Sequence, residues 1–195
     1  MKTKVLILLF LICLFSLAGC GGSGRTGTVE PSGAAAPTAA APPAAKTHLS
    51  PAEQAAIREA VLAHNRISHV SGEFSCESHI LLAAETRSDG AEEGDRVTYY
   101  LMALYQAYDQ TKDGPKVVSG SSMPIALTFA VHENGEGHTL LEYWEPQGGN
   151  RYMERLRAKF PASVPDEDLD TQKYIAQLIE DCDAQAEAFF AHGGD

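Results

Sequence analysis

The sequence lacks a hydrophobic run long enough to cross a lipid bilayer. Its longest apolar stretch, residues 5–17, contains 13 residues. At about 1.5 Å per helical residue it falls short of the ~30 Å hydrocarbon core. Lys2 and Lys4 precede the stretch, and small residues follow it. This pattern is typical of a secretory signal peptide, so we expect residues 1–19 to be cleaved and not to form a stable span.

The common catalytic motifs are also missing. The sequence contains no His-Glu-x-x-His, no Gly-x-Ser-x-Gly and no Cys-x-x-Cys. These absences remove the usual signatures of zinc metallopeptidases, serine hydrolases and dithiol or zinc sites. Gly21, Gly22 and Gly24 have no Gly-Lys-Ser/Thr after them, so they do not form a phosphate-binding loop.

Basic residues are scarce. The chain has 15 lysines and arginines against 26 acidic residues, a formal net charge of −11. Removing residues 1–19 would take away Lys2 and Lys4 but no acid, leaving 13 basic and 26 acidic residues, or −13. Such a balance disfavours nucleic acid and anionic headgroups as partners, so we expect no nucleic-acid binding.

Cysteine is rare, and one of the four cysteines closes a specific motif. Leu17-Ala18-Gly19-Cys20 follows the apolar stretch and resembles the lipobox of bacterial lipoproteins at every position. The resemblance implies a diacylglycerol group on the Cys20 sulfur, cleavage before Cys20, and a fatty acid such as palmitate on the new amino terminus. Since each buried methylene contributes about 0.8 kcal/mol, two or three chains would hold the protein firmly in a membrane. The alternative is an ordinary signal peptide with a chance cysteine.

Two cysteines remain after Cys13 leaves with the signal peptide and Cys20 is lipidated. Cys76 and Cys182 form an even pair in a compartment that permits oxidation, and we predict a disulfide between them. It would close a loop of about 106 residues, for which the chain-entropy model allows up to about 4.7 kcal/mol. The alternative is a pair of buried free thiols.

A tether follows the predicted lipid site. Residues 20–47 consist mainly of glycine, alanine, proline, serine and threonine. This composition buries too little apolar surface to offset chain entropy, so we predict a disordered linker. Gly21 stands where aspartate would signal retention in an inner membrane, which weakly favours an outer membrane in a two-membrane envelope. We expect residues 48–195 to form one globular domain.

The pattern of the remaining chain predicts an α+β domain. Ser50, Pro51 and Glu53 form a helix start with a capping box. Four strands are predicted at residues 78–86, 96–108, 123–132 and 139–145, with a short edge segment at 116–120. Helices are predicted at 150–160 and 169–191. Both faces of 96–108 are apolar, which indicates a central strand covered on each side.

The economical topology is a four-stranded antiparallel meander after an N-terminal helix. We expect the two C-terminal helices to pack on one face, in a two-layer domain. A curled sheet of the cystatin-like or NTF2-like kind is an alternative by fold-level analogy. Cys182 falls on the apolar stripe of the last helix, where Cys76 in the first strand could meet it.

The region from about residue 77 to 190 resembles a domain of bacterial extracytoplasmic proteins. Copies of this domain also lie at the C-terminus of antirepressor-type membrane zinc metallopeptidases. The matching segments are residues 77–81, 97–105, 118–121, 124–129, 141–146, 157–161 and 170–175. The peptidase part, with its membrane helices and His-Glu-x-x-His motif, is absent here. The resemblance therefore implies a sensor-like or interaction module and not proteolysis.

Two groups of residues are candidate reactive sites. His79 and Glu142 lie on predicted strands and Glu77 directly precedes the first of them, and two carboxylates with an imidazole can perform acid–base or glycoside chemistry. The alternative is a charged sheet face. His132 and His138 flank the predicted Asn134-Gly135 turn and could bind a divalent ion, although their spacing matches no known metal motif, and solvated turn residues are the preferred interpretation.

Taken together, the sequence predicts a lipid-anchored, extracytoplasmic binding or interaction domain of the cell envelope. We expect no enzymatic activity, no metal and no cofactor. The expected partners are the membrane, through the Cys20 lipid, and a protein or small-molecule ligand. A surface hydrolase using Glu77, His79 and Glu142, and a purely structural envelope lipoprotein, are the alternatives.

Overall fold

A computed structural model describes residues 48–88, 95–132 and 137–193. The chain divides into two units, Met1–Ala40 and Ala41–Asp195, and the description concerns the second. The predicted signal peptide, Cys20 and the predicted tether all lie outside the described residues, as do Glu133, Glu136 and the Asn134-Gly135 turn.

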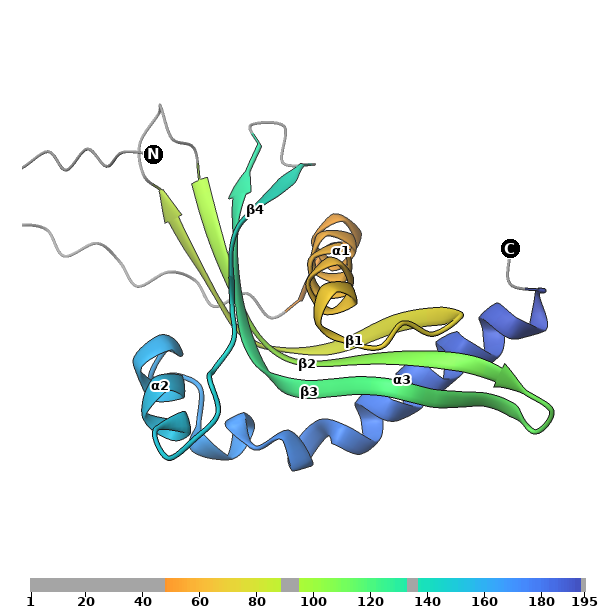
Figure 1. Ribbon diagram of the computed structural model, residues 1–195. Helices are drawn as coiled ribbons and strands as arrows, with labels where there is room; N and C mark the ends of the chain where they lie inside the picture. Colours follow the sequence, from red (N-terminus) through yellow and green to blue (C-terminus); the bar gives the residue numbers. More distant parts are fainter. Residues whose placement is uncertain (1–47, 89–94, 133–136, 194–195) are drawn as a thin grey trace, which may run out of the picture. The chain divides into compact units, whose positions relative to one another are not determined.

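The order of elements confirms the predicted α+β class (Figure 1). A helix comes first, four strands follow, and the chain ends with two α-helices separated by a short 3-10 turn. The elements are α1 Pro51–Ser68, β1 Phe74–Ser88, β2 Asp95–Thr111, β3 Gly114–Val131, β4 His138–Trp144, α2 Tyr152–Lys159, η1 Asp166–Leu169 and α3 Thr171–Ala191. The predicted edge segment at 116–120 is thus part of one long β3 strand.

Helix α1 begins where its capping box predicts. The backbone N–H of Glu53 donates to Ser50 Oγ at 3.3 Å, and the N–H of Ser50 donates to Glu53 Oε2 at 2.7 Å. Pro51 occupies the first turn, where its missing N–H costs nothing. These local contacts fix the point at which the chain enters the domain.

The four strands form an antiparallel meander in the order β1-β2-β3-β4. Residues 99–108 of β2 are all buried, as expected for a central strand. A bulge in β1 between Leu81 and Ala83 shifts its register with β2. Strands β1, β2 and β3 bend along their length, and α1 lies inside the bend (Figure 1).

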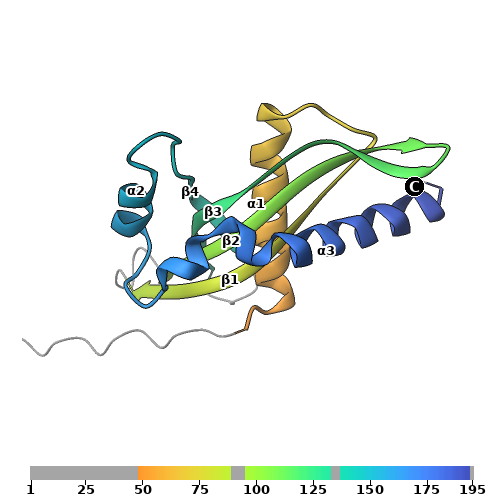
Figure 2. The ribbon, with the colours of Figure 1, turned by 90° about the horizontal axis from the view of Figure 1, so that it is seen from below.

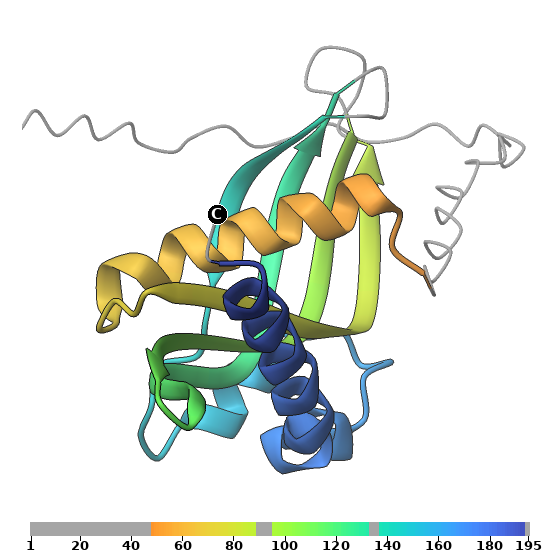
Figure 3. The ribbon, with the colours of Figure 1, turned by 90° about the vertical axis from the view of Figure 1, so that its right-hand side faces the viewer.

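The sheet is covered on both faces, so the expected two-layer arrangement is wrong. Ile57, Ala60 and Val61 of α1 pack against alternate β2 residues from Val97 to Ala107. Helices α2 and α3 share the opposite face, as predicted, where Leu156 and Leu178 contact the other set of β2 side chains. Figures 2 and 3 show α1 and α3 on opposite sides of the strands. Three layers follow because β2 is apolar on both faces.

Within the described ranges, no helix combines the length and the apolar character needed to cross a bilayer.

Candidate functional site

A pocket opens at the outer edge of β1, between α1 and α3. Its volume is about 470 Å³. We call it the edge pocket, and it is lined by Gln54 and Arg58 of α1, Glu77, Ser78, His79 and Leu81 of β1, Asp181 and Gln185 of α3, and His48 and Leu49. The two residues from each helix are four positions apart, so each pair lies on one helix face.

Glu77 is the central charged group of the edge pocket. Its side chain is only 2% exposed, and Oε2 lies 2.9 Å from His79 Nδ1. Because an ionised carboxylate can only accept, the hydrogen of this bond belongs to Nδ1. Oε1 lies 3.6 Å from Arg58 Nε, an ion pair beyond hydrogen-bond distance. A buried charge is costly to desolvate, and these two neighbours offset part of that cost.

Side chains of α3 hold the other wall of the edge pocket to β1. Gln185 Nε2 donates to the backbone carbonyl of Glu77 at 2.9 Å. Ser78 Oγ donates to Asp181 Oδ2 at 3.1 Å. The carbonyl of Glu77 therefore points away from β2, toward α3 and the pocket.

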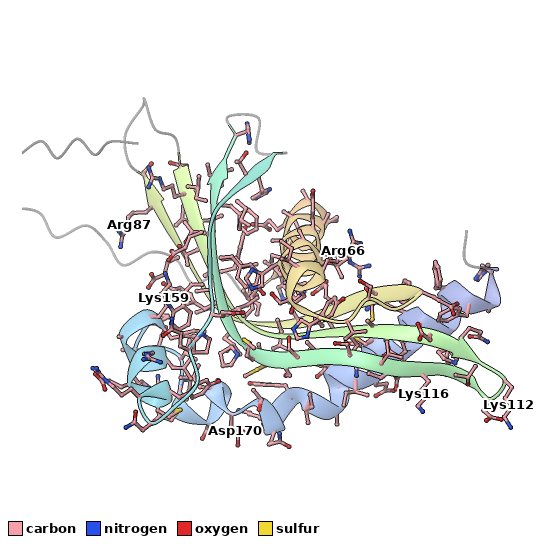
Figure 4. All side chains as sticks on the ribbon, in the orientation of Figure 1. Arg66, Arg87, Lys112, Lys116, Lys159 and Asp170 are labelled. Atoms are coloured by element: carbon pink, nitrogen blue, oxygen red, sulfur yellow. The ribbon has the colours of Figure 1, made fainter. Side chains whose placement is uncertain are left out.

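The structure brings Glu77 and His79 together but not Glu142. Glu142 lies on β4, the opposite edge strand, where Lys159 Nζ donates to its Oε2 at 2.8 Å. Figure 4 labels Lys159 on α2. Neighbouring strands are about 4.8 Å apart, so three strand spacings place β1 and β4 roughly 14 Å apart. The predicted combination of Glu77, His79 and Glu142 does not form one site.

The edge pocket also lacks a paired nucleophile and base among the described residues. Ser78 and His79 are adjacent in a strand, so their side chains project to opposite faces of the sheet. Ser78 bonds to Asp181, and His79 bonds to Glu77. These polar groups of the pocket are thus bonded to one another.

The two histidines of the predicted metal alternative have separate surroundings. His132 Nε2 lies 2.9 Å from Thr139 Oγ1. The His138 ring packs edge-on against Phe129, with centroids 5.9 Å apart. In the described part of the chain, no group of three or more histidine, cysteine, aspartate or glutamate side chains is arranged to hold a metal ion.

Cys76 and Cys182 meet as predicted, but the predicted disulfide is not present. Both are buried free thiols in the cluster between β1, β2 and α3. Cys76 Sγ donates to the backbone carbonyl of Cys182 at 3.6 Å. The apolar stripe of α3 correctly predicted that Cys182 lies near Cys76. Each thiol packs as a small apolar group, and the sulfurs are not at bonding distance.

A second cavity of about 490 Å³ lies on the concave face near the start of α1. Tyr99 and Val131 form part of its floor, and Glu53 and His138 are at its wall. The Tyr99 hydroxyl donates to Glu53 Oε1, while Glu53 Oε2 accepts from the Ser50 backbone. Both carboxylate oxygens therefore serve the attachment of α1, and we assign this cavity no ligand.

The sequence did not identify Arg58, Asp181 or Gln185 as site residues. The spacings of Gln54 with Arg58 and of Asp181 with Gln185 show which residues share a helix face. No local signal shows that these faces, which are more than 100 residues apart in sequence, flank the same strand.

In comparisons with known proteins, no family model, no curated protein and no solved structure matches the chain. The lipobox and the similarity to the metallopeptidase-associated domain remain predictions from the residues.

Proposed function

We propose that the chain is a lipid-anchored, extracytoplasmic binding domain without enzymatic activity, and that the edge pocket is its ligand site. The observation that carries the site is the buried Glu77 carboxylate in an open pocket, with His79, Arg58 and Asp181 converging on the same space. Ligand sites are concave and place a few polar groups on a formed scaffold. An apolar residue at position 77 would avoid the desolvation cost if the position served packing alone.

The lipobox supports the location. A lipid on Cys20 and a tether over residues 20–47 would hold the domain close to a membrane while leaving the edge pocket open to solution. In this proposal the membrane is a partner only through the lipid, and the pocket receives a separate ligand.

Replacing the lipid-bearing cysteine tests the anchor. We expect Cys20→Ala to abolish incorporation of labelled palmitate and to leave the chain unanchored or uncleaved, because the sulfur is the site of modification. Cys13→Ala is the matched control and should be labelled like the parent. Continued labelling of the Cys20→Ala chain would contradict the proposal.

Site-specific photocrosslinking tests the edge pocket in intact cells. A photoreactive amino acid at Gln54, which lines the pocket, should give a covalent adduct with the ligand. The same amino acid at the exposed Gln147, which does not line the pocket, is the control. A purely structural lipoprotein predicts no adduct specific to position 54, and a hydrolase predicts that the captured molecule is chemically altered.

A further inference from the structure

The outer edge of β1 has backbone groups available for pairing. In an antiparallel strand the N–H and C=O of one residue point to the same side, and the side alternates along the chain. The Gln185 bond shows that the Glu77 carbonyl points away from β2. Ser75 and His79 therefore share this outward direction. Within the described residues, these three have no backbone–backbone bond outside the ladder with β2.

Other free edges of the sheet carry features that oppose strand pairing. Strand β4 pairs only with residues 126–131 of β3, so the first part of β3 is also an edge. That part contains Pro115 and Pro124, and Lys116 lies near the turn (Figure 4). Strand β4 has 7 residues. Proline, lysine and shortness are the usual protections of edge strands. Residues 74–81 of β1 contain no proline, lysine or glycine.

Gln185 substitutes for a missing neighbouring strand. Its side-chain amide donates to the outward carbonyl of Glu77, as a backbone N–H of a fifth strand would. Such a bond is easily exchanged for an equivalent one because the side chain is only partly buried. The edge is therefore satisfied at one carbonyl and still open to a partner.

Charge around this edge favours a basic partner. Helix α3 carries Glu180, Asp181, Asp183 and Glu187 against a single lysine, Lys173. Glu77 adds a buried carboxylate to the floor of the edge pocket. Among the described residues, Arg58 is the one arginine or lysine that lines the pocket, and its side chain is 54% exposed, which allows it to turn toward solvent.

We propose that an extended, basic segment of a partner polypeptide adds to the outer edge of β1 as a fifth strand, with a lysine or arginine side chain against Asp181. The inference rests on the proposed function, since it names the ligand class of the edge pocket. Main-chain hydrogen bonds to Ser75, Glu77 and His79 supply the affinity, and the acidic wall supplies the selectivity. A second copy of this chain is disfavoured as the occupant, because two copies of net charge −11 would bring the same acidic walls together.

Backbone-modified peptides give the direct test. The probe is a blocked, fluorescent peptide in which lysine alternates with threonine and valine, added to the full lipidated chain in non-ionic detergent. We expect saturable binding by fluorescence anisotropy. N-methylation of the amides on one side of the peptide should weaken binding at least about tenfold, because it removes ladder donors but leaves every side chain in place. A norleucine-for-lysine peptide should bind less tightly than the lysine peptide.

Two pairs of variants test whether the peptide binds at the outer edge of β1. Gln185→Ala should raise affinity about two- to tenfold, because it removes a competitor whose net contribution is that of one hydrogen bond. Gln177→Ala, which removes an exposed glutamine earlier on the same helix, should leave affinity unchanged. Asp181→Asn should reduce the preference for lysine over norleucine, while Glu180→Gln should preserve it. All four positions lie on α3 and none belongs to the apolar core, so folded protein is expected in each case.

Several results would overturn the inference. These are equal binding of the N-methylated peptide, no peptide binding at all, self-association of the chain through β1, or tighter peptide binding after deletion of residues 21–47, which would identify the tether as the occupant. If the crosslinking at Gln54 succeeds while the peptides fail, strand addition is wrong and the binding-domain proposal stands.

Discussion

Burial governs the ionisation of several tyrosine side chains in this sheet. The pKa values of Tyr99, Tyr108 and Tyr143 lie far above the ordinary tyrosine value. Burial is the main cause, and nearby carboxylates add to it. The same causes, burial and Glu85, raise the pKa of Tyr100 to about 12. Each of these phenols therefore keeps its proton in the folded domain at a pH where a free tyrosine loses it.

This difference predicts loss of stability in alkali. Below about pH 10 the phenols are protonated in both states, so the stabilisation is complete. As the pH rises above 10, the unfolded chain releases protons first and the free energy of unfolding falls. We expect phenolate absorbance from these residues to appear together with the loss of circular dichroism. Phenolate absorbance from Tyr99 and Tyr143 at pH 10 in a domain with native circular dichroism would contradict the interpretation.

The cysteine pair gives a second prediction. A hydrogen bond with Cys76, together with burial, raises the pKa of the Cys182 thiol, so its reactive thiolate is disfavoured. We expect the processed, lipidated chain to show no rapid reaction with a thiol reagent when folded and two thiols after unfolding without reductant. Cys76→Ala should leave one. If no thiol reacts after unfolding without reductant, the disulfide predicted from the sequence is present.

At the scale of single residues, the sequence predicted neighbours along a strand but not across elements. Glu77 and His79 were predicted as part of one candidate site, and they are bonded, as residues two apart on one strand face can be. Glu142 was grouped with them because strand order does not show which side chains are adjacent. Arg58 was not foreseen because its contact with Glu77 depends on the packing of α1 across β1.

At the scale of the elements, the faces of strand β1 were only partly predicted by its apolar alternation. Alternation placed Ile80, Leu82 and Ala84 on one face. Ile80 does pack toward α3, but Ala84 belongs to the α1 face. The bulge between Leu81 and Ala83 inserts one residue and exchanges the two faces beyond it. Each segment looks regular in sequence, so the exchange has no local signal.

Helix α3 should depend on one narrow stripe for its attachment. Leu178 is fully buried against β1 and β2, while the next residue, Ile179, is 36% exposed. We expect Leu178→Ala to lower the free energy of unfolding by about 2–5 kcal/mol, because it leaves a cavity in the cluster. Ile179→Ala should cost less than about 2 kcal/mol, since part of this side chain already faces solvent and its removal leaves no closed cavity. Denaturant unfolding measures both, and equal losses would show that the helix packs on another face.

At the scale of the whole molecule, the sequence predicted the meander and the pairing of α2 with α3 on one face. It did not place α1 on the opposite face. The signal was present in residues 96–108, whose apolar character on both sides requires two covers. The predicted two-layer domain covered only one of these two faces.

The division into tether and domain predicts the course of limited proteolysis. Arg25 and Lys46 are the basic residues of the predicted tether. Trypsin should cut there before it cuts at Arg58 or Lys116, because backbone in a helix or sheet resists entry into a protease site. The domain should then pass from the membrane to the soluble fraction with a new amino terminus at Thr47, as read by mass spectrometry. Lys46→Gln should move the last cut to Arg25, and earlier cleavage inside the domain would contradict the division.

The bulge in β1 also sets an upper length for any segment that joins the sheet. Residues 74–81 form the regular run before the register shifts, and beyond it the outward-facing groups change parity. Beyond that point, a longer partner segment would place its N–H and C=O groups opposite β1 residues whose own groups point toward β2, so the extra residues would gain no main-chain hydrogen bonds. Lengthening the partner segment beyond the run that faces residues 74–81 should therefore not increase its affinity.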